Sequence, residues 1–322
     1  MPGYSSALGT VAIAKQTGKG VAAAVPTVKF ALTATSLMPD KRRARYASTD
    51  LGRDEGPAYT AGIGVAGDFS HYLHFDGFAL EALLALGSNA NAGAGPDYTH
   101  TGTPVDALPY FTLWRMVGGV VTEKWIDCKC SMLRVESGAG SPVTVTLGVV
   151  GITAEFEAAD TALARLQSPG LLHMEAAGRF KFATVAQQLA RCSFEVNNNV
   201  SGYQADDYAY ADIDEGKRNI AFSFGTRFRG PLAFPKYRDF YYNGDAGTTL
   251  SPVVGTQAFE VEYRRAANQF VKIALPELSF AAVPVQSDPG GAPIEVEVAC
   301  EVNKPAAAAI VTTTVGDQTA TW

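Results

Sequence analysis

The sequence predicts a mainly β fold with a single helix, and three observations support this. Hydrophobic residues make up 47% of the 322 residues, which is enough to build a large core. Valine, threonine, phenylalanine and tyrosine recur in alternating runs, as in strands that bury one face. The 32 glycines and 17 prolines divide these runs at turn-like positions. One large β domain is therefore the simplest expectation.

The N-terminal part of the chain contains three predicted strands. Residues 11–14 form a short apolar run that ends in the turn Gln16-Thr17-Gly18. Residues 27–32 give a second strand. Residues 63–69 give a third, because Ile63 and the residues at positions 65, 67 and 69 share one face.

The helix is predicted at residues 75–86, where apolar side chains recur every three or four residues. Asp76 is a plausible N-cap and Gly87 a plausible C-terminal stop. Glu81 is the charged residue expected on a thin exposed side. A helix with so little polar surface should lie against a sheet.

The middle of the chain predicts an antiparallel meander formed by residues 110–117, 120–136 and 143–150. The Gly/Asn/Ala-rich residues 88–96 are expected to be a loop. Residues 158–166 suit either a helix or an ordered loop, and the sequence leaves both open.

The C-terminal half continues with strands. Cys192, Phe194 and Val196 share one face of a strand that ends in the turn Asn197-Asn198-Asn199. Further strand candidates are residues 259–264, 270–275, 294–302 and 310–315. Without repeats or linkers, the chain is expected to be one domain, 1–322, with an N-terminal arm (1–10), an Asp/Tyr-rich insertion (about 200–250) and a C-terminal tail.

Residues 38–59 are predicted to be a long charged loop, because regular alternation stops there. Its charged residues include Lys41, Arg42, Arg43, Arg45, Asp50, Arg53, Asp54 and Glu55. Long irregular segments in compact domains tend to be functional. Blocks of both signs suit docking onto a complementary neighbour. A nucleic-acid patch and a solvated loop are the alternatives, although a net charge of −6 gives no basic face.

No catalytic, cofactor or metal site is predicted. Gly18-Lys19-Gly20 lacks the spacing of a phosphate loop. The acidic residues 205–215 are expected to be a solvated loop, and they lack the calcium-loop spacing that would be the functional alternative. The four histidines are scattered. The four cysteines are expected to be buried free thiols rather than a zinc site or a disulfide framework.

The N-terminus does not read as a signal peptide, and no apolar run is long enough to span a membrane. The chain is therefore expected to be made in the cytoplasm. Charged residues account for only 18%, below the ~25% of typical soluble domains. Part of its surface should accordingly be hidden in an assembly.

The order of these parts resembles the major tail tube proteins of long-tailed, siphophage-type bacteriophages. The likeness rests on strand 11–14 with its Gln16-Thr17-Gly18 turn, the charged loop, strand 63–69 and the helix closed by Gly87. It also includes the segments 108–113, 127–133 and 192–198.

The resemblance implies a β-sandwich or half-barrel with one flanking α-helix, closing into a continuous β-barrel tube on oligomerisation. Such proteins form homo-hexameric rings that stack into the virion tail, and double-stranded DNA passes through the lumen without specific binding during genome ejection. Long loops bridge successive rings, so residues 38–59 would supply inter-ring contacts. Tail terminator, tape measure and distal tail proteins are the implied partners; no cofactor or membrane is implied.

Two other function classes remain open from the sequence. Tyr203, Tyr208 and Tyr210 could form the contact surface of a β-sandwich adhesin or receptor-binding virion protein, since tyrosine-rich loops make good contacts. An enzyme would need convergent titrating side chains in a pocket, and the sequence offers no such set.

Overall fold

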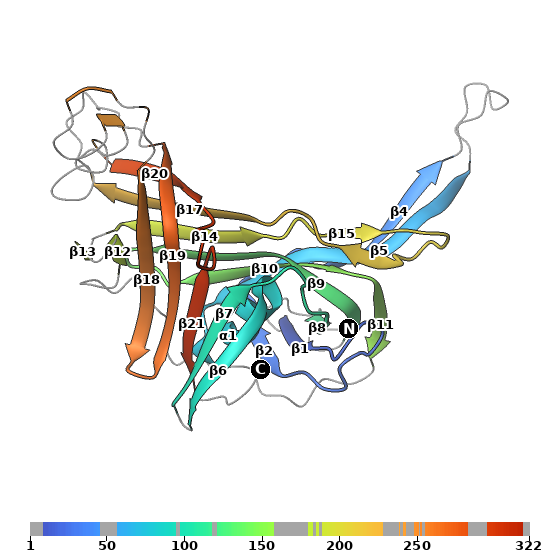
Figure 1. Cartoon of the computed structure of the whole chain (residues 1–322). Coiled ribbons are helices and arrows are strands. Elements are labelled where there is room, and N and C mark those ends of the chain that lie inside the picture. The colour runs from blue at the N-terminus through green and yellow to red at the C-terminus, as the bar shows by residue number, and fades with distance from the viewer. Residues whose placement is uncertain are drawn as a thin grey trace.

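The architecture comes from a computed structural model of the whole chain. It describes residues 9–45, 57–94, 97–117, 121–157, 180–182, 185–186, 189–227, 238, 241–242, 248–250, 252, 255–282 and 295–317. Within them the chain is mainly β, with the helix α1 (Phe75–Leu86) packed among the strands (Figure 1). The predicted fold class is confirmed: the strands form a sandwich whose large sheet is not closed into a barrel within one chain.

The strands form two antiparallel layers that share one long strand. The smaller layer has the order β2 (Val28–Ala31), β1 (Thr10–Lys15), β8 (Phe111–Val117), the first half of β9 (Val121–Gly138) and β11 (Thr153–Glu157). The larger layer begins at β5 (Ala58–Tyr72), which pairs on one edge with β4 (Met38–Arg45) and β3 (Ala34–Thr35). On its other edge follow β10 (Thr144–Gly151), the second half of β9, β14 (Arg191–Asn197), β17 (Asn219–Arg227) and β20 (Glu295–Val302). The layer continues with β19 (Gln269–Ala282), β18 (Thr256–Ala266), β12 (Phe180–Phe182) and β13 (Val185–Ala186). From β19 a branch runs through β21 (Thr312–Asp317), β7 (Asp97–Pro104) and β6 (Gly87–Ala94).

Strand β9 passes from one layer to the other at Asp127. This residue has a φ of 55°, unusual for a residue with a side chain, and the register with β8 shifts beside it. Its carboxylate accepts hydrogen bonds from the Gln16 side chain at 3.1 Å and from the Gly20 amide at 2.8 Å. The Gly/Lys turn after β1 is therefore hydrogen-bonded to the residue at which β9 crosses between the two layers.

The helix has the predicted bounds and is buried almost completely, because the two layers and the β6–β7 hairpin surround it. Leu80, Leu84 and Leu86 have no exposed surface. Two expectations about this helix were wrong. His74, without a side-chain hydrogen bond, occupies the N-cap position in place of Asp76. Glu81 is fully buried rather than exposed.

The C-terminal end of the helix is closed from two sides. Gly87 adopts a left-handed conformation with a φ of 96°, and its amide donates to the Leu83 carbonyl, as predicted from the glycine stop. The Asn198 side chain donates to the carbonyls of Ala85 at 3.0 Å and Cys130 at 3.1 Å. Asn198 thus satisfies a helix-end carbonyl that has no partner within the helix.

Most predicted strands are confirmed, including the meander, which corresponds to β8, β9 and β10. Two predicted loops were wrong. Residues 88–94 belong to β6, which pairs with β7, and residues 38–45 form β4, which pairs with β5. Both strands lack alternating large apolar residues because neither buries one face in the core, so their pairing has no period-two signature. Residues 158–166 lie outside the described part of the chain.

All four cysteines are free and buried, as predicted. Burial raises the pKa of the Cys128, Cys130, Cys192 and Cys300 thiols. These thiols are consequently poor nucleophiles at neutral pH.

Candidate assembly interface

A two-stranded arm projects from the body of the molecule (Figure 1). We define the arm, which is distinct from the predicted N-terminal arm (1–10), as residues 38–45 of β4 and 58–64 of β5. Most of its side chains are exposed. Strand β4 carries Lys41, Arg42, Arg43 and Arg45 against the single acid Asp40, whereas the whole chain has a net charge of −6. The arm is therefore a basic projection on an acidic protein.

The arm contains a β-bulge close to its middle. Arg42 pairs with Gly62 but Arg43 pairs with Thr60, which leaves Ala61 as the extra residue. A bulge bends a strand pair and increases its twist. The sequence of the arm therefore contributes to the direction in which it leaves the body.

A second hairpin lies against the base of the arm. We call residues 201–214 the strut; they include β15 (Ser201–Tyr203) and β16 (Asp212–Asp214). Strand β10 ends opposite Val65, and beyond that point the strut occupies the edge of β5. The Ile63 amide donates to the Tyr208 carbonyl at 2.7 Å, and the Gln204 side-chain amide donates to the carbonyl of the bulge residue Ala61 at 3.0 Å.

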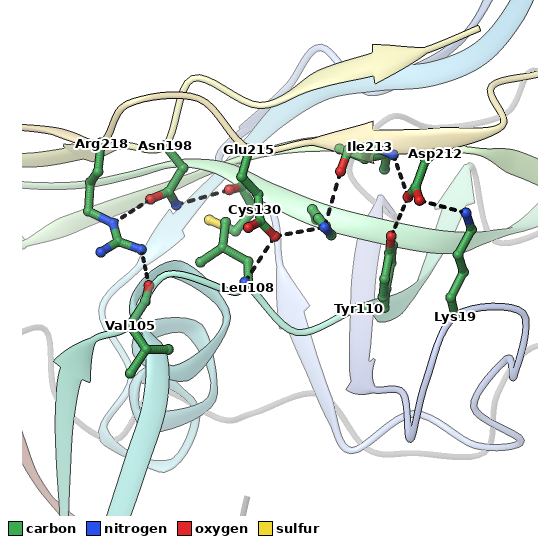
Figure 2. Close-up of polar contacts among 11 residues, drawn as sticks. Lys19, Val105, Leu108, Tyr110, Cys130, Asn198, Asp212, Ile213, Glu215 and Arg218 are labelled. Atoms are coloured by element: carbon green, nitrogen blue, oxygen red, sulfur yellow. Dashed lines mark hydrogen bonds and ion pairs between the residues drawn. The ribbon is translucent and has the colours of Figure 1, made fainter. Parts of the chain in front are cut away.

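The other end of the strut is fixed to the body by Asp212 (Figure 2). Its carboxylate accepts a hydrogen bond from the Tyr110 hydroxyl at 2.5 Å and lies 2.9 Å from the Lys19 ammonium. Lys19 also donates to the Ala211 carbonyl at 2.6 Å. The Tyr110 and Lys19 hydrogen bonds lower the pKa of Asp212 to about 2, because both favour the charged carboxylate.

A second attachment follows directly in the chain. The buried Lys129 ammonium donates to the Ile213 carbonyl at 3.1 Å and to the Glu215 carboxylate at 2.7 Å, and it lies 4.5 Å from the centre of the Tyr110 ring. Glu215 also accepts the Leu108 amide at 3.0 Å (Figure 2). Residues 205–215 are thus not the fully solvated loop that the sequence suggested.

Comparison with known proteins identifies the family. A family model described as phage tail tube protein matches residues 6–313, nearly the whole chain. The chain belongs to the phage tail tube protein family. The resemblance noted from the order of its sequence elements is confirmed. Comparison with curated proteins gave no match.

In this tail tube protein, the arm brings together four of the residues predicted to make inter-ring contacts. Lys41, Arg42, Arg43 and Arg45 lie on β4 and are exposed. The other four, Asp50, Arg53, Asp54 and Glu55, fall outside the described residues. The structure corrects the predicted loop at 38–45 and 58–59 to a paired hairpin, and the assembly role of these residues stays a prediction.

The residues that connect the arm to the body have no local signature in the sequence. Their partners lie far away in the sequence. Asp212 is 102 residues from Tyr110, Gln204 is 143 residues from Ala61, and Lys19 is 192 residues from Ala211. The glycines at 62 and 64 are the one indication of this contact in the sequence. They lie on the same face of one strand, and glycine inside a strand often marks a place where another segment approaches closely.

No group of three or more His, Cys, Asp or Glu side chains that could hold a metal occurs among the residues that the structure describes. Likewise, within that part of the chain no helix is long and apolar enough to cross a membrane.

The strut attachment should weaken in acid. A carboxylate whose folded-state pKa is depressed contributes stability above its unfolded pKa of roughly 3.9 and loses it as pH falls towards the folded value. For Asp212 this window runs from about pH 4 down to about 2. Because Asp212 is nearly half exposed, we expect the contribution to be at most ~1 kcal/mol.

Urea unfolding measured between pH 5 and pH 2.5 checks this expectation. The Asp212→Asn variant should show a shallower loss of stability across that window than the wild-type chain. Asp214→Asn, two residues along the same strut strand, is the matched control and should follow the wild type. Parallel pH profiles for wild type and Asp212→Asn would contradict the prediction.

Proposed function

We propose that this protein is a structural, non-catalytic component of the virion tail whose copies form hexameric rings that stack into the tail tube. The observation that carries the proposal is the family match along residues 6–313. Genome DNA would pass through the lumen of the tube during ejection. A net charge of −6 supports this use, since like charge keeps DNA from adhering to the wall.

Open sheet edges support assembly between copies. Among the described residues, β11 pairs with β9 on one side, and its Phe156 side chain is 82% exposed. An exposed edge strand with a large apolar side chain is a template for pairing with another chain. We propose that neighbouring subunits cover such edges, so that the sheets of one ring continue around the lumen.

The arm is the proposed contact between successive rings. It is basic, it extends from the body, and the remainder of the chain is acidic (Figure 1). Charge complementarity of this kind fixes register and orientation between partners. In this proposal the basic residues of β4, Lys41, Arg42, Arg43 and Arg45, bring positive charge close to an acidic surface of a copy in the next ring. Tail terminator, tape measure and distal tail proteins are the proposed partners at the ends and in the lumen of the tube.

Negative-stain electron microscopy of the purified protein, over a range of concentrations, tests the proposal. Hollow tubes or uniform rings are expected, with six-fold symmetry in end-on views. A ring with another symmetry would refute the hexamer but keep the tube. If the protein stays monomeric, short tail fragments from virions are added as seeds, and failure to lengthen them would refute the proposal. Discrete trimers or spiky fibres would favour a β-sandwich adhesin that uses Tyr203 and Tyr208.

A further inference from the structure

We infer that the strut is a positioning device that fixes the direction of the arm before copies meet, with Tyr210 as its central positioning residue. The inference rests on the proposed role of the arm in stacking. It gives the first part of the Asp/Tyr-rich insertion a role other than the adhesin surface that its tyrosines suggested from the sequence.

The Tyr210 ring is enclosed by two glycines from different elements. A Cβ atom added to Gly64 on β5 or to Gly202 on β15 would collide with this ring. Both positions therefore need glycine for the ring to fit. Neither has a left-handed backbone conformation, so the close approach of Tyr210 is the physical reason for these glycines. The Tyr210 ring therefore packs against β5 of the arm on one side and against β15 of its own strut on the other.

Arg42 covers the same ring from the arm. Its guanidinium carbon lies 5.1 Å from the centre of the Tyr210 ring, within the range of a cation–π contact. Its Nη2 also lies 3.4 Å from the Gln204 side-chain oxygen. A Cβ atom on Gly62 would collide with the Arg42 side chain, so this glycine gives the side chain its path across β5. Arg42 thus faces the strut, while Arg43 and Arg45 are exposed further out.

Backbone hydrogen bonds hold the same two segments together. Ile63 and Ala209 form a parallel bridge, and the Tyr208 carbonyl and the Gln204 amide bind the edge of β5 on both sides of the Gly62 position. Together with the Asp212 and Glu215 attachments, this forms a continuous path of contacts from the body through the strut to the arm. The arm is therefore held from its second edge as well as through its own strands.

A fixed arm has a direct consequence for assembly. Binding by a segment already in its bound orientation avoids the entropy cost of ordering it. A two-stranded ribbon without support is only marginally ordered. We therefore expect the strut to affect the rate and concentration dependence of tube growth much more than the stability of the fold.

The first measurement concerns arm direction and does not depend on tube formation. The native cysteines are all buried, so spin labels attach selectively to new cysteines at Lys41 on the arm and Ser141 on the body. In dilute, unassembled protein the distance distribution should be narrow. Tyr210→Ala should broaden it, whereas Tyr210→Phe, which keeps the ring, should leave it narrow. Tyr208→Ala removes a 58% exposed ring from the same strut and is the matched control.

The second measurement is tube growth by light scattering, with thermal unfolding recorded for each variant. Tyr210→Ala should slow elongation at least about tenfold while its melting temperature stays close to that of the wild type. Tyr210→Phe and Tyr208→Ala should grow normally. If Tyr210→Ala does not fold, Gly202→Val serves as the second variant, because its side chain displaces the same ring.

The outcomes separate this inference from the proposed function. An unchanged distance distribution in Tyr210→Ala would overturn the positioning role, whatever the tubes do. A broadened distribution together with normal growth would show that the strut holds the arm but that the arm is not a stacking contact. That result would refute the proposed role of the arm in assembly.

Discussion

Tubes should disappear when Arg43 and Arg45 are both replaced by glutamate. The two side chains are exposed on the outer part of β4, and the proposed partner surface is acidic. Reversal places like charges opposite one another, which costs several kcal/mol at an interface. We expect the concentration required for tubes to rise by at least about 100-fold, leaving soluble monomers or single rings. Arg42 is kept because it contacts the strut.

The matched control also replaces two basic residues by glutamate, and so changes the net charge by the same amount, but at positions far from the arm. Arg265, near the end of β18, and Lys304, two residues beyond the end of β20, are both exposed. Arg265→Glu combined with Lys304→Glu should give tubes at close to the wild-type concentration. Sedimentation and electron microscopy on the same samples provide the comparison. Normal tubes from the Arg43→Glu/Arg45→Glu variant would remove the arm from the assembly mechanism.

The second large effect is expected from the buried pair between His71 and Glu81. Neither side chain has exposed surface, and the His71 Nε2 atom lies 2.6 Å from a Glu81 carboxylate oxygen. The His71 Nδ1 atom lies 2.7 Å from the Tyr72 carbonyl, so both ring nitrogens have oxygen partners. The ring also stacks on Phe30, with centroids 4.1 Å apart. Removing one member leaves a desolvated polar group without its partner.

Glu81→Leu should therefore lower the free energy of unfolding by ~3–5 kcal/mol, a large part of the 5–15 kcal/mol typical of a domain. The double variant His71→Phe/Glu81→Leu removes both polar groups and should recover most of that loss, because apolar replacement of a whole buried pair is often neutral. The neighbouring His74 does not compensate: burial and then the nearby His71 lower its pKa to about 4, so it is uncharged at neutral pH.

Guanidinium unfolding in the Arg43→Glu/Arg45→Glu background keeps assembly from contributing to the measured stability. The control is Glu195→Gln, which breaks a partly exposed pair with Arg134 and should cost less than ~1 kcal/mol. A loss of similar size for Glu81→Leu and for the double variant would contradict the interpretation, since it would mean that packing volume rather than the hydrogen-bonded polar pair determines the stability here.

Strands with a buried face and the amphipathic helix could be predicted from the sequence because their signals are local. The bounds of α1 agree with the prediction, since apolar spacing and Gly87 define them within a few residues. The order of these elements was also sufficient to indicate the tail tube family. The charged residues of the arm were recognised as well, because blocks of opposite sign are visible without a structure.

The remaining features depend on partners distant in the chain. Strand β4 has two solvated faces, so it carries no hydrophobic alternation and its hydrogen bonds to β5 alone make it a strand. Glu81 reads as a solvent-facing charge until the fold places His71 against it. Tyr210 reads as a loop tyrosine until Gly64 and Gly202 enclose it. The sequence by itself determined the helix and the strands with a buried face, because their periodicity is local, and the order of these elements indicated the family. The tertiary structure alone decided which charges are buried and how the arm is held, because those contacts are long-range.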